Sequence, residues 1–287
     1  MPQVRAGGVD HYYEWIINGH DNPGVEKPVL VFVHGWAGSS RYWRSTAQAL
    51  KERFDCLLYD MRGFGRSQLT VRDCAMILSR GYQLSTFADD LAELLDALGL
   101  SQRVYLNAHS MGASVAVFFL NRYRDRVERA ILTCNGIFEY DQAAFEAFYR
   151  FGRYVVMFRP QWLAQIPLAP RVFMSRFLHQ PIPAAERRSF LQDFLDADFD
   201  IALGTIFTSV SKEATEVMPM EFQQLAMPTL LVSGEFDKIT PANLGEKAAA
   251  LNPLIQYCVV ARTGHFPMLE DSETYLQAVT SFLSQSP

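Results

Sequence analysis

The chain has 287 residues, of which 49% are hydrophobic and 20% are charged. This composition is ordinary for a folded globular protein and excludes an intrinsically disordered chain, and the length suits one large domain with an insertion. The formal net charge of −5 argues against a nucleic-acid-binding protein, whose binding face is usually strongly basic.

Cysteine usage and the N-terminal residues indicate the cellular compartment. Cys56, Cys74, Cys134 and Cys258 lie far apart, and no two of them have the C-x-x-C spacing of zinc and redox sites. We expect four free thiols in a reducing compartment, with neither a metal nor an organic cofactor. The first residues form no apolar region of a signal peptide, and no apolar run reaches the roughly 18 residues that span a membrane. We therefore expect a cytoplasmic protein.

Short apolar runs alternate with longer helical patterns along most of the chain. The predicted strands cover residues 29–33, 56–59, 104–106, 130–133, 229–232 and 255–260. The predicted helices cover residues 41–51, 86–98, 112–123, 242–251 and 272–283, with Ser85 as the N-cap of the second and Gly99 as its end. Strands that are apolar throughout and separated by helices indicate a parallel sheet with helices on both faces. We therefore predict an α/β fold with a mostly parallel sheet.

This alternation stops between Asn135 and about Met218. The stretch holds 11 of the 21 phenylalanines, and five prolines divide it into short helical segments. We predict a helical cap over residues 136–218, inserted before the last two strands. The core domain is then formed by residues 1–135 and 219–287.

A sharp turn between a strand and a helix is indicated at residues 107–113. Ser110 has a small residue two positions away on each side, Ala108 and Gly112, as a tight nucleophile elbow requires. Glycine usually stands where Ala108 does, but alanine is small enough for the turn. Ser110 is therefore the candidate nucleophile. Its hydroxyl needs a base, and the base needs an acid that orients it.

Two later loops supply these partners in the order expected after the serine. Asp237 follows the strand predicted at 229–232, and His265 follows the strand predicted at 255–260. Both residues therefore lie at the carboxyl ends of parallel strands, where ligands bind in open α/β sheets. Of the six histidines, we expect His265 to be the base. The alternative positions for the acid are Glu235, Glu139 and Asp141.

The residues His-Gly-Trp-Ala-Gly at 34–38 directly follow the first predicted strand. A tetrahedral oxyanion needs two preset donors, and on this kind of fold the backbone N–H groups of Trp36 and Met111 are the natural pair. We expect the Trp36 ring to form part of the pocket wall. The residues predicted to contact the substrate are Trp36, His109, Phe138 and Phe266.

Five motifs together resemble those of the α/β-hydrolase family, in its cap-bearing branch of serine esterases, haloperoxidase-like enzymes and C–C hydrolases. The motifs are H-G-W-A-G (34–38), D-M-R-G-F-G-R-S (60–67), A-H-S-M-G (108–112), G-E-F-D-K-I-T-P (234–241) and G-H-F-P-M-L-E (264–270). They occur in family order over nearly the whole chain. The resemblance implies the α/β-hydrolase fold, with Ser110 as nucleophile, Asp237 as acid and His265 as base. It implies a structural role for residues 60–67 and leaves residues 69–82 without a role.

Serine at the nucleophile position favours acyl chemistry, because the haloalkane dehalogenases and epoxide hydrolases that the chain also resembles have aspartate there. We predict a serine hydrolase that cleaves carboxylic esters with an apolar acyl or alcohol part, since the predicted cap is rich in phenylalanine. The partner is then a small-molecule ester and not a nucleic acid, and the oligomeric state is left open. The alternatives that stay open are a C–C bond hydrolase or lyase, a thioesterase and a non-catalytic ligand-binding receptor.

Residues 148–159 interleave aromatic side chains with Arg150, Arg153 and Arg159. Two interpretations stay open. The segment is either an ordinary amphipathic helix of the cap or an interfacial helix that dips into lipid while its arginines reach the headgroups. Contact between the predicted cap and a membrane surface is therefore one of our expectations.

Overall fold

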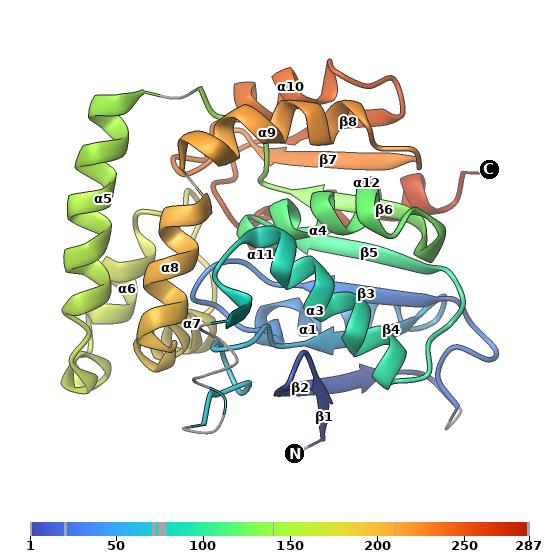
Figure 1. Ribbon diagram of the computed structural model, residues 1–287, viewed down its shortest axis with the longest axis horizontal. Helices are drawn as coiled ribbons and strands as arrows, with labels where there is room; N and C mark the ends of the chain where they lie inside the picture. Colours follow the sequence, from blue (N-terminus) through green and yellow to red (C-terminus); the bar gives the residue numbers. More distant parts are fainter. Residues whose placement is uncertain are drawn as a thin grey trace.

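The fold is built on a single sheet of eight strands (Figure 1). A computed structural model describes residues 2–285 except 20–21, 71–72, 74–78, 140 and 210, and leaves out the side chains of 143–145, 147–148 and 151. Among the described residues the strand order is β1-β2-β4-β3-β5-β6-β7-β8. The strands are β1 (Gln3–Ala6), β2 (Val9–Ile16), β3 (Val29–Val33), β4 (Asp55–Tyr59), β5 (Val104–His109), β6 (Val127–Thr133), β7 (Thr229–Gly234) and β8 (Ile255–Val260).

The six strands from β3 to β8 pair in parallel, which confirms the predicted mostly parallel sheet. The predicted limits of β3 and β8 are those observed. The antiparallel pair β1 and β2 was not predicted. Because β2 mixes Asp10, His11 and Glu14 with apolar residues, it lacks the continuous apolar run that marks a strand buried on both faces.

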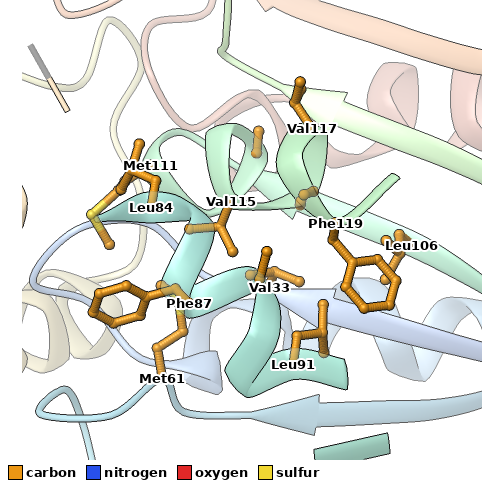
Figure 2. Packing of buried hydrophobic residues seen from close by; sticks show 14 of the residues in the cluster. Val33, Met61, Leu84, Phe87, Leu91, Leu106, Met111, Val115, Val117 and Phe119 are labelled. Carbon is orange, nitrogen blue, oxygen red and sulfur yellow. The ribbon is translucent and has the colours of Figure 1, made fainter. Parts of the chain in front are cut away.

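Helices cover both faces of the sheet. Successive side chains of β3 point to opposite faces, and all five are fully buried. One face packs against α3 (Leu84–Ala97) and α4 (Met111–Arg122), and Figure 2 shows their apolar side chains packed together over β3 and β5. The other face packs against α1 (Arg44–Leu50) and α12 (Ser272–Leu283). Continuous burial on both faces explains why β3 is apolar at every position.

The start of α3 differs from the prediction. The helix begins at Leu84, with Gln83 rather than Ser85 at the N-cap position, so the prediction of Ser85 as the cap is wrong. Leu84 and Phe87 are buried in the core, and this packing extends the helix further than a side-chain cap at Ser85 would allow. Gly99 lies just beyond the helix with a φ of 72°, which fits its predicted role as the end.

Five α-helices of the described chain come between β6 and β7 in the sequence, and four of them, α5 to α8, lie beyond the carboxyl ends of the parallel strands (Figure 1). They are α5 (Gln142–Met157), α6 (Ala169–Met174), α7 (Ala184–Asp196), α8 (Phe199–Ser209) and α9 (Lys212–Gln223). The remaining helices are η1 (Ser40–Trp43), η2 (Arg124–Arg126), η3 (Gln161–Gln165), α10 (Ala242–Ala249) and α11 (Pro267–Glu270). None of the described helices has the length and apolar character needed to cross a bilayer. The predicted domain limits at 136 and 218 stay a prediction.

A buried carboxylate joins this helical segment to the core. Asp193 of α7 accepts hydrogen bonds from Ser39 Oγ (2.5 Å) and from Arg41 Nη1 (2.6 Å), two residues that follow the 34–38 loop. Burial raises the pKa of Asp193 to about 6, although the Ser39 hydroxyl and the Arg41 charge act to lower it. The ionised carboxylate is therefore stabilised less in the folded protein than in water.

This raised pKa predicts how Asp193→Asn changes the pH dependence of stability. The folded-state pKa of about 6 lies above the ordinary 3.8, so the contribution of this carboxyl is fully present below 3.8 and is lost as the pH rises through about 6. The free energy of unfolding of the variant should therefore rise relative to wild type between about pH 4 and pH 8, by about 3 kcal/mol at most. Urea unfolding at several pH values measures this difference. The exposed Asp196 on the same helix provides the control Asp196→Asn, and a pH-independent difference for Asp193→Asn would contradict the prediction.

Candidate active site

Ser110 sits at the turn between β5 and α4. Its φ of 55° and ψ of −124° are rare for a residue with a side chain, and its N–H donates to the Thr133 carbonyl oxygen (2.9 Å). A Cβ on Gly112 would lie 2.2 Å from the carbonyl oxygen of His34, so a larger residue does not fit there. Ala108 is fully buried within the sheet, which shows that a single methyl group is accommodated at that position.

The structure brings Ser110, His265 and Asp237 into one chain of hydrogen bonds. His265 Nε2 lies 3.0 Å from Ser110 Oγ, and His265 Nδ1 lies 2.7 Å from Asp237 Oδ2. The other carboxylate oxygen of Asp237 accepts from the N–H groups of Ile239 (2.7 Å) and Thr240 (3.0 Å). Because an ionised carboxylate only accepts, Nδ1 carries the proton of the neutral ring, and Nε2 is free to accept the serine proton.

Two glycines allow the loops after β7 and β8 to touch. A Cβ on Gly234 would lie 1.9 Å from the carbonyl oxygen of Gly264. A Cβ on Gly264 would lie 2.5 Å from the carbonyl oxygen of Phe177, which belongs to the segment between β6 and β7. This close backbone contact holds Asp237 beside His265, although 27 residues separate them along the chain.

The three alternative acids are held elsewhere. Glu235 accepts a hydrogen bond from the N–H of Arg262 (2.8 Å), and Glu139 pairs with Lys247 at the surface (2.5 Å). Asp141 is exposed just before α5. Among the described residues, Asp237 is therefore the candidate that is hydrogen-bonded to His265.

The loop after β3 lies directly on the elbow. A Cβ on Gly35 would lie 3.2 Å from the Cβ of Ser110, which brings the next residue, Trp36, beside the serine. Met111 is the first residue of α4, and the first N–H groups of a helix have no carbonyl partner within it. The half-buried ring of Trp36 donates from Nε1 to the carbonyl oxygen of Ala202 in α8 (2.9 Å). The roles of Trp36 and Met111 as oxyanion donors stay a prediction.

Comparison with known proteins identifies the family. The family described as "alpha/beta hydrolase fold" matches residues 28–272. The chain belongs to the α/β hydrolase family.

The relatives of this α/β hydrolase have names that refer to the hydrolysis of different chemical bonds. A protein of Caulobacter sp. described as a carbamate hydrolase is 30% identical over a match that covers 45% of this chain and 44% of that protein. The proline iminopeptidase of Heyndrickxia coagulans is 26% identical, with 92% of this chain and 93% of that protein covered. A thermophilic esterase from Thermogutta terrifontis has a similar structure, with a TM-score of 0.74, 24% identity, and 98% and 97% of the two chains covered. Together these matches support a hydrolase without naming its substrate.

His109 connects two loops of this α/β hydrolase through hydrogen bonds of its ring. Its side chain is buried; Nδ1 accepts from the Tyr42 hydroxyl (3.0 Å) and Nε2 donates to the carbonyl oxygen of His265 (2.7 Å). The Tyr42 hydroxyl in turn accepts from the N–H of Gly35 (2.6 Å). Burial holds the pKa of His109 well below its ordinary value, so the ring is neutral at physiological pH. His109 therefore links the loop after β3 to the loop of His265, and its predicted contact with the substrate stays a prediction.

Phe266, Phe138 and Trp36 are the other residues predicted to contact the substrate. The ring of Phe266 is nearly buried, with its centroid 4.8 Å from that of His109 and 4.6 Å from that of Phe190. It supports the His109 ring from the side. Phe138 is partly exposed on the loop after β6. Substrate contacts of Phe138, Phe266 and Trp36 stay predictions.

Glu270, at the end of the last quoted motif, was not assigned a role from the sequence. Its carboxylate accepts from the N–H groups of Gly264 (3.0 Å) and Phe266 (3.1 Å), on either side of His265. It also accepts from the N–H groups of His179 and Gln180, both at 2.7 Å. The only sequence signal was an acidic residue directly after the apolar run Pro-Met-Leu at 267–269. Glu270 therefore fastens the His265 loop to the segment between β6 and β7.

We expect Glu270→Gln to loosen the His265 loop. The amide is neutral and has one acceptor oxygen where the carboxylate has two, so all four N–H groups lose a charged acceptor and some of them lose their acceptor altogether. The free energy of unfolding should fall by about 2 kcal/mol, in the range of hydrogen bonds to charged groups. The kcat for ester hydrolysis should fall about tenfold with little change in KM, because His265 loses orientation rather than substrate contact. Glu273→Gln, in the first turn of α12, is the matched control, and equal behaviour of the two variants would refute the role.

One group of residues in the described chain has atoms close enough to hold a metal ion. It comprises His109, Cys134 and His265, whose ligand atoms lie within 4.8 Å of one another. Both nitrogens of each ring already have hydrogen-bond partners, and burial beside Asp237 raises the pKa of the Cys134 thiol well above its ordinary value. These donors therefore do not fit a metal site. Cys56, Cys134 and Cys258 are free thiols, and Cys74 lies outside the described residues.

Proposed function

We propose that the protein is a serine hydrolase that cleaves carboxylic esters with an apolar acyl or alcohol part. The observation that carries this proposal is the chain of hydrogen bonds from Ser110 through His265 to Asp237, with lengths of 3.0 and 2.7 Å. Serine at the elbow favours acyl transfer over the aspartate chemistry of other family members. The esterase of similar fold is consistent with this choice of bond.

The proposed reaction follows from these positions. Ser110 Oγ attacks the ester carbonyl carbon while His265 Nε2 takes its proton, and Asp237 stabilises the imidazolium ion. The N–H groups of Trp36 and Met111 stabilise the oxyanion. His265 then protonates the leaving alcohol, which departs and leaves an acyl-enzyme. A water molecule activated by His265 releases the acid and restores Ser110.

The helices between β6 and β7 are proposed to cover the serine as a cap over residues 136–218. Phe177 of this segment lies beside the base, with its ring centroid 6.2 Å from that of His265. Its carbonyl oxygen also accepts a hydrogen bond from the N–H of His265 (2.7 Å). Phe173 packs against Phe177, with a centroid distance of 5.7 Å. These half-buried rings support an apolar acyl or alcohol pocket.

An acyl chain-length series tests the proposed substrate class. Each methylene buried from water contributes up to about 0.8 kcal/mol, so kcat/KM for p-nitrophenyl esters should rise about threefold to fourfold per methylene while the pocket has room. The trend should reverse where the pocket ends. A series that is flat or falls from acetate onward would mean that the aromatic rings only pack the helical segment itself.

The same assay separates the alternative activities. Thioesters, carbamates and a dienoate with a cleavable C–C bond are measured beside the esters. Covalent labelling of Ser110 by an organophosphonate reports a reactive nucleophile independently of turnover. A higher kcat/KM on one of the other classes would move the assignment to it, and the absence of both labelling and turnover would indicate a ligand-binding receptor.

A further inference from the structure

Large apolar side chains are exposed together on the segment between β6 and β7. Of the fifteen large hydrophobic residues that the described chain exposes, eight lie between residues 154 and 199, with 40% to 70% of their surfaces exposed. We call them the apolar face: Tyr154, Met157, Phe158, Trp162, Ile166, Leu168, Val172 and Phe199. Single exposed apolar residues are normal, but such a grouping marks an interaction surface.

Most members of the apolar face come from one stretch of the chain. All but Phe199 lie on the stretch that runs from the end of α5 through η3 to α6, either in these helices or in the connections between them. The rings of Phe158 and Trp162 meet edge to face, with centroids 6.5 Å apart. Met157, Phe158 and Phe199 line a hollow of about 300 Å³. In Figure 1, α5 forms the left edge of the molecule, on the side of the segment away from the sheet.

The charge of the surrounding segment is opposite to that of the remaining chain. Residues 147–185 contain five arginines and no lysine, aspartate or glutamate. The formal charge of −5 therefore divides into +5 on these 39 residues and −10 on the other 248. The exposed arginines of the segment are Arg150, Arg153, Arg171 and Arg176.

The α5 helix presents both kinds of side chain on one side. Arg150, Arg153, Tyr154 and Met157 are spaced by three or four residues and are all exposed, whereas Val156 is buried. Apolar side chains with arginines beside them are the combination that enters the boundary between headgroups and acyl chains. The arginines add attraction to anionic headgroups.

We propose that the apolar face docks this protein on the surface of an anionic lipid membrane. The membrane supplies an apolar phase for the exposed rings and negative charge for the arginines. A second copy of the chain is the other occupant to consider. Two-fold pairing through this face would bring two segments of charge +5 together, which opposes self-association. The inference does not depend on the proposed ester hydrolysis.

Vesicle sedimentation tests the proposal with the full chain. Wild type should sediment with vesicles of equal parts phosphatidylcholine and phosphatidylglycerol, and much less with phosphatidylcholine alone. Phe158→Ser with Trp162→Ser should lower the partition coefficient about tenfold or more, because both rings leave the interface. Arg150→Gln with Arg153→Gln should lower it about thirtyfold at low salt.

Matched controls lie near the amino ends of the parallel strands, just before β3, β5 and β6 in the sequence. Val25→Ser removes an exposed apolar side chain, and Arg103→Gln with Arg124→Gln removes two exposed positive charges, so both should leave vesicle binding unchanged. Hydrolysis of a short soluble ester should be the same in wild type and all variants, which separates docking from catalysis.

Three outcomes would overturn the proposal. Wild type that fails to bind either vesicle has no such docking surface. If Arg150→Gln with Arg153→Gln abolishes vesicle binding while Phe158→Ser with Trp162→Ser leaves it intact, the protein adsorbs electrostatically and its rings do not insert. Sedimentation equilibrium provides the third outcome. If wild type is a dimer that binds no vesicles, and Phe158→Ser with Trp162→Ser makes it a monomer, the apolar face serves self-association.

Discussion

Ser110→Ala should lower kcat for ester hydrolysis by about 10⁴-fold or more, because serine, base and acid act as a unit. The change removes the Oγ that lies 3.0 Å from His265 Nε2 and leaves the strained turn and its backbone bond to Thr133 in place. The thermal midpoint should therefore stay close to that of wild type. Covalent labelling by a fluorophosphonate should disappear.

Ser114, one turn further along α4, provides the matched serine control. Its hydroxyl accepts a hydrogen bond from Asn135 (2.8 Å). Ser114→Ala should retain labelling and activity within a small factor. Labelling that survives in Ser110→Ala would mean that another serine is the nucleophile and would overturn the proposed mechanism.

Asp237→Asn should lower kcat by about 10⁴-fold through the wrong tautomer of His265. The N–H groups of Ile239 and Thr240 both donate to Oδ1 of the native residue, so the asparagine oxygen must stay on that side. The amide NH₂ then faces His265 Nδ1 and donates to it. The ring proton is forced onto Nε2, which can no longer accept the proton of Ser110.

Glu235→Gln and Glu139→Gln test whether the acid has been assigned correctly. Both side chains bond elsewhere, to the Arg262 N–H and to Lys247, so both variants should keep nearly normal kcat. Near-normal activity of Asp237→Asn, together with loss of activity on changing Glu139 or Asp141, would move the acid to the loop after β6.

Much of the core could be predicted from local patterns alone. A strand buried on both faces must be apolar at every position, and the five fully buried side chains of β3 show this directly. Ser110 was found because a sharp turn demands small neighbours, and the close approach of Gly112 to His34 shows why. Asp237 and His265 were found because the ends of parallel strands meet at one edge of the sheet.

The features that were missed depend on neighbours distant in the chain. The β1 and β2 pair mixes apolar and polar residues, since its strands are less completely covered than the central ones. The hydrogen bonds of His109 were missed for the same reason. In the sequence it stands beside Ser110, but its hydrogen bonds to Tyr42 and His265 span 67 and 156 positions.

The sequence by itself determined the α/β fold, the family motifs and the three residues of the proposed triad, because burial and turn geometry restrict which residue types fit locally. Only the tertiary structure decided what holds those residues in place. Glu270 binds N–H groups 91 positions away, and Asp193 reaches Ser39 across 154. A buried carboxylate can be stabilised by any nearby donor, so its own sequence surroundings do not identify its partner. The partner is specified when folding brings the two segments together.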